Sequence, residues 1–183
     1  MTAAPTLSIL VVCTANRFRS PLVAAVLEQE LDGLPVEVRS RGINDVGAMP
    51  PLSQALETAS GLGIDIARHR ARQLGTEDLQ EADVVIGFER SHLVAAGEAG
   101  AVPGGVFGLE ELVTALERLD RPPGLRNYAS SVRANLTAAD LLRDPDGSIL
   151  EIEDPVKKTR REAAEIAERI HALSLRLAEL LTP

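Results

Sequence analysis

Short apolar runs alternate with longer amphipathic stretches along most of the chain. Residues 7–12 are apolar and rich in β-branched side chains, which is typical of a buried parallel strand. After a polar turn, apolar residues return at helical spacing from residue 22 to residue 31, and Gly33 ends that stretch. The same patterns predict, in order, a strand over 36–40, a helix over 52–62, strands over 82–87 and 105–108, and a helix over 109–119. This order indicates the α/β class, with a parallel sheet covered by helices on both faces.

Residues 120–150 break this rhythm. Proline and glycine place a loop at 121–124 and a turn at 144–147, and one helix is expected over 131–142. About 30 residues are too few to bury a core of their own. We therefore expect a single domain over 1–183 that carries an insertion at about 118–150.

The last helix has the clearest signal in the chain. Thr159 and Glu162 match a capping box, in which each side chain bonds the backbone N–H of the other residue. The apolar stripe that follows consists of Ile166, Ile170, Leu173, Leu177 and Leu181.

Charge and composition exclude several classes of function. The chain has 183 residues and a net charge of −8, which argues against a nucleic-acid partner because phosphate neutralisation needs a cationic face. No apolar run reaches the roughly 20 residues of a membrane helix, and residues 1–6 lack the basic start of a signal peptide. We therefore expect a cytoplasmic protein with no membrane partner. A single cysteine excludes a disulfide within the chain and a cysteine-based zinc site.

That cysteine stands at an informative place. Cys13 follows the first predicted strand, Arg19 comes six residues later, and Ser20-Pro21 is a candidate N-cap and first residue of the next helix. A loop between a parallel strand and a helix N-terminus turns several backbone N–H groups toward one point, which binds an oxyanion and favours a thiolate. Arg19 can bind two phosphate oxygens at once, and Ser20 can donate to the thiolate. The alternative is an inert buried cysteine beside a solvated arginine.

The segment resembles the phosphate-binding P-loop of the low molecular weight protein tyrosine phosphatase family, whose pattern is Cys, five residues, Arg, then Ser or Thr. That family implies a flavodoxin-like fold with a four-stranded parallel sheet and the site at the carboxyl ends of the strands. Further matches follow along the chain: Ser40-Arg41-Gly42, Gly63-Ile64-Asp65, the stretch from His69 to Leu74, the strand at 82–86 with His92 beyond it, and Asp154-Pro155.

The resemblance implies phosphoryl transfer without a metal or a cofactor, on a phosphorylated protein or a small phosphoester. The Cys13 thiolate would attack phosphorus to form a cysteinyl phosphate. Arg19 would stabilise the phosphate oxygens, and Asp154 would protonate the leaving oxygen and then deprotonate the attacking water. The phosphate-binding residues that it implies are Thr14, Ala15, Asn16, Arg17, Phe18, Arg19 and Ser20.

Three of the matched residues are expected to support the loop. Asn16 and Ser20 would hold its shape by hydrogen bonds, and His69, which the family places near this asparagine, is expected to have a structural role. Asp144-Pro145 competes with Asp154 as the general acid, but it lies in ordinary turn sequence, whereas Asp154 leads into the last helix.

The sequence departs from the family at the positions that select a substrate. Ala15 replaces a loop glycine, and Phe18 replaces a second cysteine found in many members. Arg17 places a cation at the mouth of the pocket, which should repel a guanidinium substrate and attract an acidic one. The two stretches that usually supply aromatic walls contain no aromatic residue. Tyr128 is a candidate wall, although its place in the insertion favours an anchoring role.

Two other functions stay open from the sequence. An arsenate reductase would need an external thiol, because the chain has no further cysteine to relay electrons. A non-catalytic module would bind phosphate or another anion without turnover. The insertion at 118–150 is a candidate lid, since it comes just before the proposed acid in the sequence. The sequence does not indicate the oligomeric state.

Overall fold

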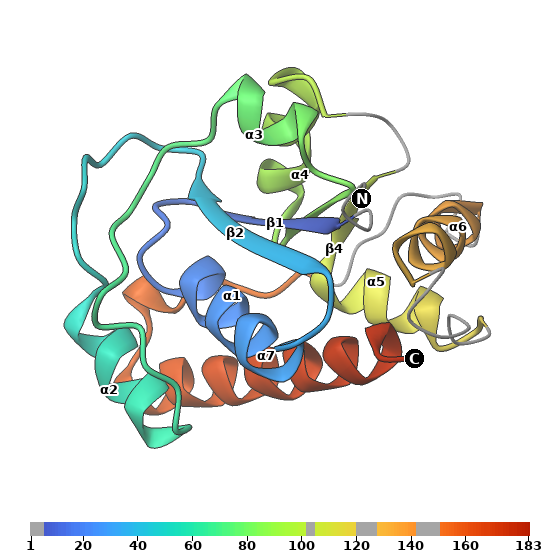
Figure 1. Ribbon diagram of the computed structural model, residues 1–183. Helices are drawn as coiled ribbons and strands as arrows, with labels where there is room; N and C mark the ends of the chain where they lie inside the picture. Colours follow the sequence, from blue (N-terminus) through green and yellow to red (C-terminus); the bar gives the residue numbers. More distant parts are fainter. Residues whose placement is uncertain (1–5, 102–104, 120–127, 142–150) are drawn as a thin grey trace.

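Four parallel strands form the centre of the computed structural model, which describes residues 6–101, 105–119, 128–141 and 151–183. The strands are ordered β2-β1-β3-β4 across the sheet (Figure 1). Their bounds are Leu7–Cys13 for β1, Val36–Gly42 for β2, Val84–Gly87 for β3 and Val106–Gly108 for β4. Because every pairing is parallel, the carboxyl ends of the strands meet at one edge of the sheet. The predicted four-stranded parallel sheet is confirmed.

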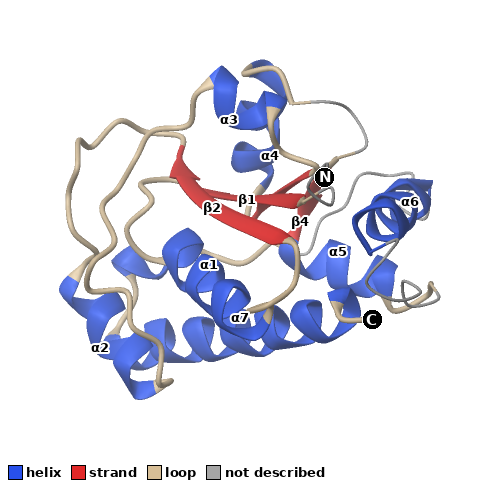
Figure 2. Cartoon of the chain, viewed as in Figure 1, coloured by secondary structure: helices blue, strands red, loops and turns tan. Residues whose placement is uncertain are grey.

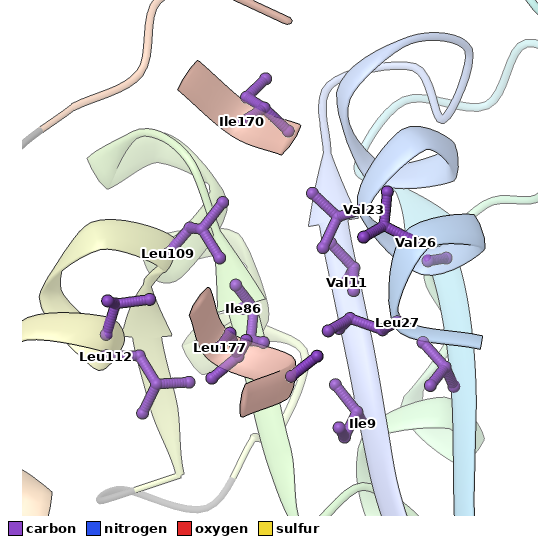
Figure 3. Close-up of a cluster of buried hydrophobic side chains, with 14 of the residues drawn as sticks. Ile9, Val11, Val23, Val26, Leu27, Ile86, Leu109, Leu112, Ile170 and Leu177 are labelled. Atoms are coloured by element: carbon purple, nitrogen blue, oxygen red, sulfur yellow. The ribbon is translucent and has the colours of Figure 1, made fainter. Parts of the chain in front are cut away.

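Helices cover both faces of this sheet, as Figure 2 shows. They are α1 Arg19–Glu30, α2 Ser53–Gly61, α3 Thr76–Gln80, α4 Arg90–Glu98, α5 Leu109–Leu116, α6 Tyr128–Leu141, the 3₁₀ turn η2 Pro155–Lys157 and α7 Arg160–Leu181. Ile9 and Val11 of β1 join the larger core, under α1, α5 and α7 (Figure 3). Leu10 and Val12 point to the opposite face and join a smaller core with residues of α3 and α4. None of the helices in the described ranges is long and apolar enough to cross a membrane.

The connection between β3 and β4 differs from the prediction. The sequence pattern placed these two strands next to each other in the chain, and this was wrong, because α4 lies between them. Two parallel neighbours need a crossover between them, and a helix is its usual form. The helix was missed because it buries only His92 and Ala96, so it has no apolar stripe. The short helix α3 was missed for the same reason, since Leu79 is its one buried residue.

The ends of α1 and α7 were predicted with different success. Ser20 is not the N-cap of α1: the helix begins at Arg19, and Phe18 precedes it without a side-chain cap. The capping box of α7 is confirmed, since Thr159 Oγ1 accepts from the Glu162 N–H at 3.3 Å and Glu162 Oε2 accepts from the Thr159 N–H at 2.8 Å.

The helix expected in the insertion is present as α6, but it is no lid over the carboxyl ends of the strands. Arg133 of α6 donates to both carboxylate oxygens of Asp83, at 2.6 and 2.9 Å, and to the Thr6 carbonyl at 2.9 Å. Thr6 and Asp83 directly precede β1 and β3, so α6 lies at the amino ends of these strands, near the N-terminus in Figure 1. Its apolar side packs into the larger core through Ala129, Val132, Leu136 and Ala139. The rest of the insertion, 120–127 and 142–150, lies outside the described residues.

Candidate active site

The loop that joins β1 to α1 is held at the carboxyl edge of the sheet. Cys13 is the last residue of β1 and is only 3% exposed. The loop is tied to the segment after β2, because the Ile43 N–H donates to the Cys13 carbonyl and the Asn44 N–H to the Thr14 carbonyl, both at 2.9 Å. The N-terminus of α1 follows at once, with its unpaired N–H groups and its positive dipole end. This arrangement favours binding of an anion beside Cys13.

Asn16 fixes the shape of this loop from inside. It is fully buried and has a φ of 54°, a left-handed conformation that asparagine tolerates better than most residues. Its Nδ2 donates to the hydroxyls of Ser20 and Ser40, each at 2.9 Å, and its Oδ1 accepts from the Arg72 N–H at 3.0 Å. One side chain thus joins the loop, β2 and the segment after α2, which agrees with the predicted supporting role.

Ser20 lies next to the thiol. Its Oγ is 3.0 Å from Cys13 Sγ, and it already accepts a hydrogen bond from Asn16. The hydroxyl proton of Ser20 is therefore left for Cys13 Sγ or for the Arg41 carbonyl, which is farther away at 3.4 Å. A bond to a thiolate is charge-assisted and so is the stronger of the two. The placement puts a hydroxyl donor beside Cys13 Sγ.

Arg19 carries a charge that is almost completely buried, with 1% of the residue exposed. Its Nη1 donates to Glu89 Oε1 at 2.6 Å and to the Ile152 carbonyl at 2.9 Å. Its Nη2 donates to Thr14 Oγ1 at 3.2 Å and lies 3.2 Å from Asp154 Oδ2. These contacts leave the guanidinium no free rotation, so it is already oriented when an anion arrives.

His92 orients Thr14 from behind the loop. His92 Nδ1 accepts from the backbone N–H groups of Phe88 and Glu89, at 3.2 and 3.1 Å. The ring proton is therefore on Nε2 and is donated to Thr14 Oγ1 at 3.1 Å. Burial and the nearby Arg19 charge lower the pKa of His92 to about 4. Because Thr14 Oγ1 accepts from both His92 and Arg19, its own proton remains available for a bound anion.

Asp154 reaches the same place from the other end of the chain. The Ile152 N–H donates to the Phe88 carbonyl at 2.8 Å, which fixes this segment beside the end of β3. Asp154 caps η2, because its Oδ1 accepts from the Val156 N–H at 3.1 Å, and its Oδ2 faces Arg19. Its side chain is 38% exposed, so it stands between the buried thiol and solvent. Its competitor Asp144 lies outside the described residues.

A small cavity brings most of the predicted residues together. It is lined by Cys13, Thr14, Ala15, Arg17, Phe18, Arg19, Leu52, Asp154 and Val156. Leu52 and Val156 of this lining are aliphatic. Val156 belongs to the second of the two stretches expected to lack an aromatic wall, 156–158, whereas Leu52 lies beyond the first, 43–46. Phe18 is the one aromatic residue in this lining, and it is 4% exposed and belongs to the core. The side chain of Tyr128 lies outside the description, so its role as a wall stays a prediction.

The remaining predicted residues lie around the cavity. Arg17 is held at the rim, where its Nε donates to the Pro50 carbonyl at 2.7 Å. His69 lies behind the loop and its Nε2 is 2.8 Å from the Asn16 carbonyl, as a supporting role requires. Burial lowers the pKa of His69, which favours a neutral ring that donates this hydrogen bond.

Sequence reasoning missed Glu89 and gave His92 no role. Glu89 directly follows the strand residues and Phe88, and a polar residue just after a predicted parallel strand lies at the edge where the site forms. That position was the available signal for Glu89. His92 was noted as a match to the family because it follows the strand at 82–86. Its contact with Thr14 depends on α4, which the sequence pattern did not predict.

Comparison with known proteins gives one consistent family. The sequence model of the family described as low molecular weight phosphotyrosine protein phosphatase matches residues 8–121. The probable low molecular weight protein-tyrosine-phosphatase EpsP of Ralstonia nicotianae is 37% identical over 108 residues, which is 57% of this chain and 72% of the relative. A protein-arginine-phosphatase of Bacillus subtilis is 32% identical over 111 residues, which is 59% of this chain and 73% of the relative.

Solved structures agree on the fold over nearly the whole chain. The low molecular weight protein tyrosine phosphatase from T. tengcongensis is similar with a TM-score of 0.70 and 25% identity, over 95% of this chain and 99% of that one. The tyrosine phosphatase AmsI of Erwinia amylovora has a TM-score of 0.72 at 19% identity, over 100% of this chain and 98% of that one.

The contact between Gly42 and the loop generates a stability prediction. A Cβ at residue 42 would lie 2.8 Å from the Ala15 carbonyl carbon and 2.9 Å from the Asn16 backbone nitrogen, neither of which can rotate away. We expect Gly42→Ala to lower the free energy of unfolding by about 1–3 kcal/mol and to weaken vanadate binding, because the loop must move. Urea denaturation and vanadate titration measure the two effects.

Gly61→Ala is the matched control. A Cβ at residue 61 meets nothing within 4 Å, and the residue lies in α2, so stability should be unchanged or rise by up to about 1 kcal/mol. Equal stability and equal vanadate affinity in Gly42→Ala and the wild type would contradict this account of the loop.

The low pKa of His92 predicts an acid-sensitive fold. Between pH 6.5 and about 4 the unfolded chain binds a proton at His92 that the folded chain does not. The free energy of unfolding therefore includes the full contribution of neutral His92 above pH 6.5. This contribution falls by up to about 3 kcal/mol as the pH drops to 4. Urea denaturation across this range should give a flatter pH profile for His92→Gln than for the wild type. His171→Gln, which removes a histidine from α7, should keep the wild-type profile; a wild-type slope in His92→Gln would refute the assignment.

Proposed function

Because the chain belongs to the low molecular weight phosphotyrosine protein phosphatase family of cysteine-based phosphatases, we propose that Cys13, Arg19 and Asp154 hydrolyse phosphomonoesters without a metal. The observation that carries this assignment is their convergence on one small cavity from positions 13, 19 and 154. Cys13 Sγ attacks phosphorus while the ester P–O bond breaks, and Asp154 gives its proton to the leaving oxygen. Water then attacks the cysteinyl phosphate, Asp154 takes its proton, and inorganic phosphate and the thiolate are released.

The other residues of the loop serve this reaction by position. Arg19 and the backbone N–H groups of residues 14–19 stabilise the charge that builds up on the phosphate oxygens. The Thr14 hydroxyl donates to the same oxygens, because His92 and Arg19 occupy its acceptor positions. Ser20 stabilises the thiolate, both before the attack and when Cys13 leaves phosphorus.

Two competing functions are less well supported. Arsenate reduction with an external thiol would use Cys13, but the family match and the named relatives are phosphatases. A module that only binds anions has no need for an acid at the mouth, whereas Asp154 is held there by Arg19 and by its capping bond. A cytoplasmic location suits the lone thiol nucleophile, because a reducing compartment keeps it active.

Aryl phosphates with leaving groups of different acidity test the mechanism. We expect Cys13→Ser to lose turnover, and Asp154→Asn to lose about 10²- to 10⁴-fold in kcat, with the largest loss for the most basic leaving group. Glu153→Gln is the matched control, since this neighbouring carboxylate is exposed and paired with Lys158, and it should keep wild-type rates. Loss of the same factor for every leaving group would exclude Asp154 as the acid. A folded, reduced wild type that binds vanadate without turnover would support the binding module.

The positive charge of Arg17 at the rim of the cavity affects which phosphoesters the site accepts. Arg17 is held beside the mouth by Pro50, and a cation there repels a substrate guanidinium and favours acidic surroundings of the phosphoester. We propose phosphotyrosine in proteins, or another phosphoester of similar size, rather than phosphoarginine.

Kinetics on peptide substrates check this preference. For wild type, kcat/KM should be higher on a phosphotyrosine peptide than on a phosphoarginine peptide of the same sequence. Arg17→Ala should raise the phosphoarginine value by about 3- to 10-fold, the effect of removing roughly 1 kcal/mol of repulsion. Arg118 is an exposed arginine just after α5, so Arg118→Ala should change neither value. An unchanged ratio in Arg17→Ala would remove Arg17 from the selection of substrate.

A further inference from the structure

A second, much larger hollow lies along the outer edge of the sheet. It is a groove of about 500 Å³ between β2, α1 and the segment 65–72. None of the residues that line it lines the cavity at Cys13. The catalytic assignment therefore leaves this groove without a role.

The floor of the groove is an open sheet edge. β2 is an outer strand, and in its parallel pairing with β1 residues 37, 39 and 41 direct their backbone groups to β1. Val38 and Ser40 therefore direct theirs outward, and both residues line the groove. At Gly42 the outward groups are used, since its N–H donates to the Arg72 carbonyl at 2.9 Å and its carbonyl accepts from the Leu74 N–H at 2.8 Å. The Ser40 carbonyl also has a partner, since it accepts from Arg41 Nη1 at 2.8 Å. Among the described residues, the outward groups without a partner at this edge are therefore the N–H and carbonyl of Val38 and the N–H of Ser40.

The wall of the groove is positively charged. Arg68, Arg70 and Arg72 are exposed side chains that line it, and none of them pairs with a carboxylate in the described part of the chain. Within the described ranges, Arg70 donates to the backbone carbonyls of residues 67 and 69, at 3.2 and 2.7 Å, and to no carboxylate. By contrast, Arg39 and Arg41 of β2 are paired with the carboxylates of Glu81 and Asp78, respectively. Three unpaired arginines in one short segment are unexpected in a chain of net charge −8.

Two carboxylates also line the groove. Asp65 Oδ1 accepts from the Ala67 N–H at 2.8 Å, which makes it part of the turn that presents the arginines. Glu28 lies on α1 and is exposed, so with Asp65 it sets two negative charges against the three arginines. The charge toward an incoming ligand remains positive.

We propose that this groove binds an extended acidic peptide segment that adds to β2 as an outer strand. The backbone of the peptide would pair with the N–H and carbonyl of Val38 and with the N–H of Ser40. Its carboxylates would bind Arg68, Arg70 and Arg72. An exposed strand edge recognises main chain of any sequence, whereas the arginines select acidic side chains. A free edge and a row of planar cations together fit a peptide better than a small anion, which would use the arginines alone.

The occupant would lie directly beside the catalytic loop. His69 of the groove is 2.8 Å from the Asn16 carbonyl, the Arg72 N–H donates to Asn16 Oδ1, and the Ser40 hydroxyl accepts from Asn16 Nδ2. A protein held in the groove by an acidic segment would thus be kept next to Cys13. Binding itself does not depend on the catalytic assignment, because no residue of the Cys13 cavity takes part.

Fluorescence anisotropy with the full chain tests the proposal. The probe is a labelled peptide of alternating glutamate and valine, and the variant is Arg68→Gln/Arg70→Gln/Arg72→Gln. We expect binding that the triple variant weakens by about tenfold or more. Arg118→Gln/Arg161→Gln removes two exposed positive charges elsewhere and should leave the affinity unchanged. Cys13→Ser should bind as well as the wild type, whether or not the proposed catalysis is correct.

A second peptide separates strand addition from charge alone. The same sequence with alternate backbone nitrogens methylated keeps its charge but cannot pair with β2, so it should bind about tenfold more weakly. Hydrogen exchange of the Val38 and Ser40 amides should slow when the unmodified peptide is bound. Equal affinity for the methylated peptide would overturn the proposal in favour of a site that binds negative charge alone. Displacement of the peptide by vanadate would place it at Cys13 instead, and dimer formation at the same edge would make a second copy of the chain the occupant.

Discussion

The guanidinium of Arg19 is withdrawn from water, and a buried cation is tolerated only when several acceptors surround it. Those acceptors come from every part of the site: Glu89 after β3, the Ile152 carbonyl and Asp154 before η2, and Thr14 in the loop. The requirement to pair this one charge brings the two halves of the chain together. Residues separated by more than a hundred positions thus meet at the carboxyl ends of β1 and β3.

Asn16 is a buried uncharged residue that, like Arg19, joins several segments of the site. Its amide satisfies groups on the loop, on β2 and on the segment that carries Arg72, so the conformation of the loop depends on the edge of the sheet. Gly42 must lack a side chain for the same reason, because β2 ends against the backbone of Ala15 and Asn16. The site is rigid before any substrate binds, as stabilisation of a developing charge by fixed dipoles requires.

The sequence was most informative where a short pattern of neighbouring residues has one usual structural meaning. The apolar run of β1 and the capping box at Thr159 each predicted what the structure contains. The spacing from Cys13 to Arg19 predicted residues that line one cavity, and their catalytic role stays a prediction. The sequence was less informative where a residue acts through a distant contact. Glu89 looks like an ordinary surface carboxylate until Arg19 is placed beside it, and α4 has almost no apolar face because His92 is buried for its hydrogen bonds rather than for its hydrophobicity. The position of α6 could not be predicted either, since it depends on the pairing of Arg133 with Asp83.

The cavity at Cys13 and the groove beside β2 differ in what they can recognise. The cavity at Cys13 is small, and the lining beyond its polar groups is mostly aliphatic, with Leu52 and Val156, so it would offer a phosphate group strong contacts and the rest of a substrate few. The groove beside β2 offers the opposite: main-chain groups and cations over a longer surface, with no reactive group. Because Asn16 contacts both, a mobile groove would also loosen the loop that holds Cys13. The proposed binding of a peptide in the groove and the proposed phosphoryl transfer at the cavity would therefore both require this edge of the sheet to stay in one conformation.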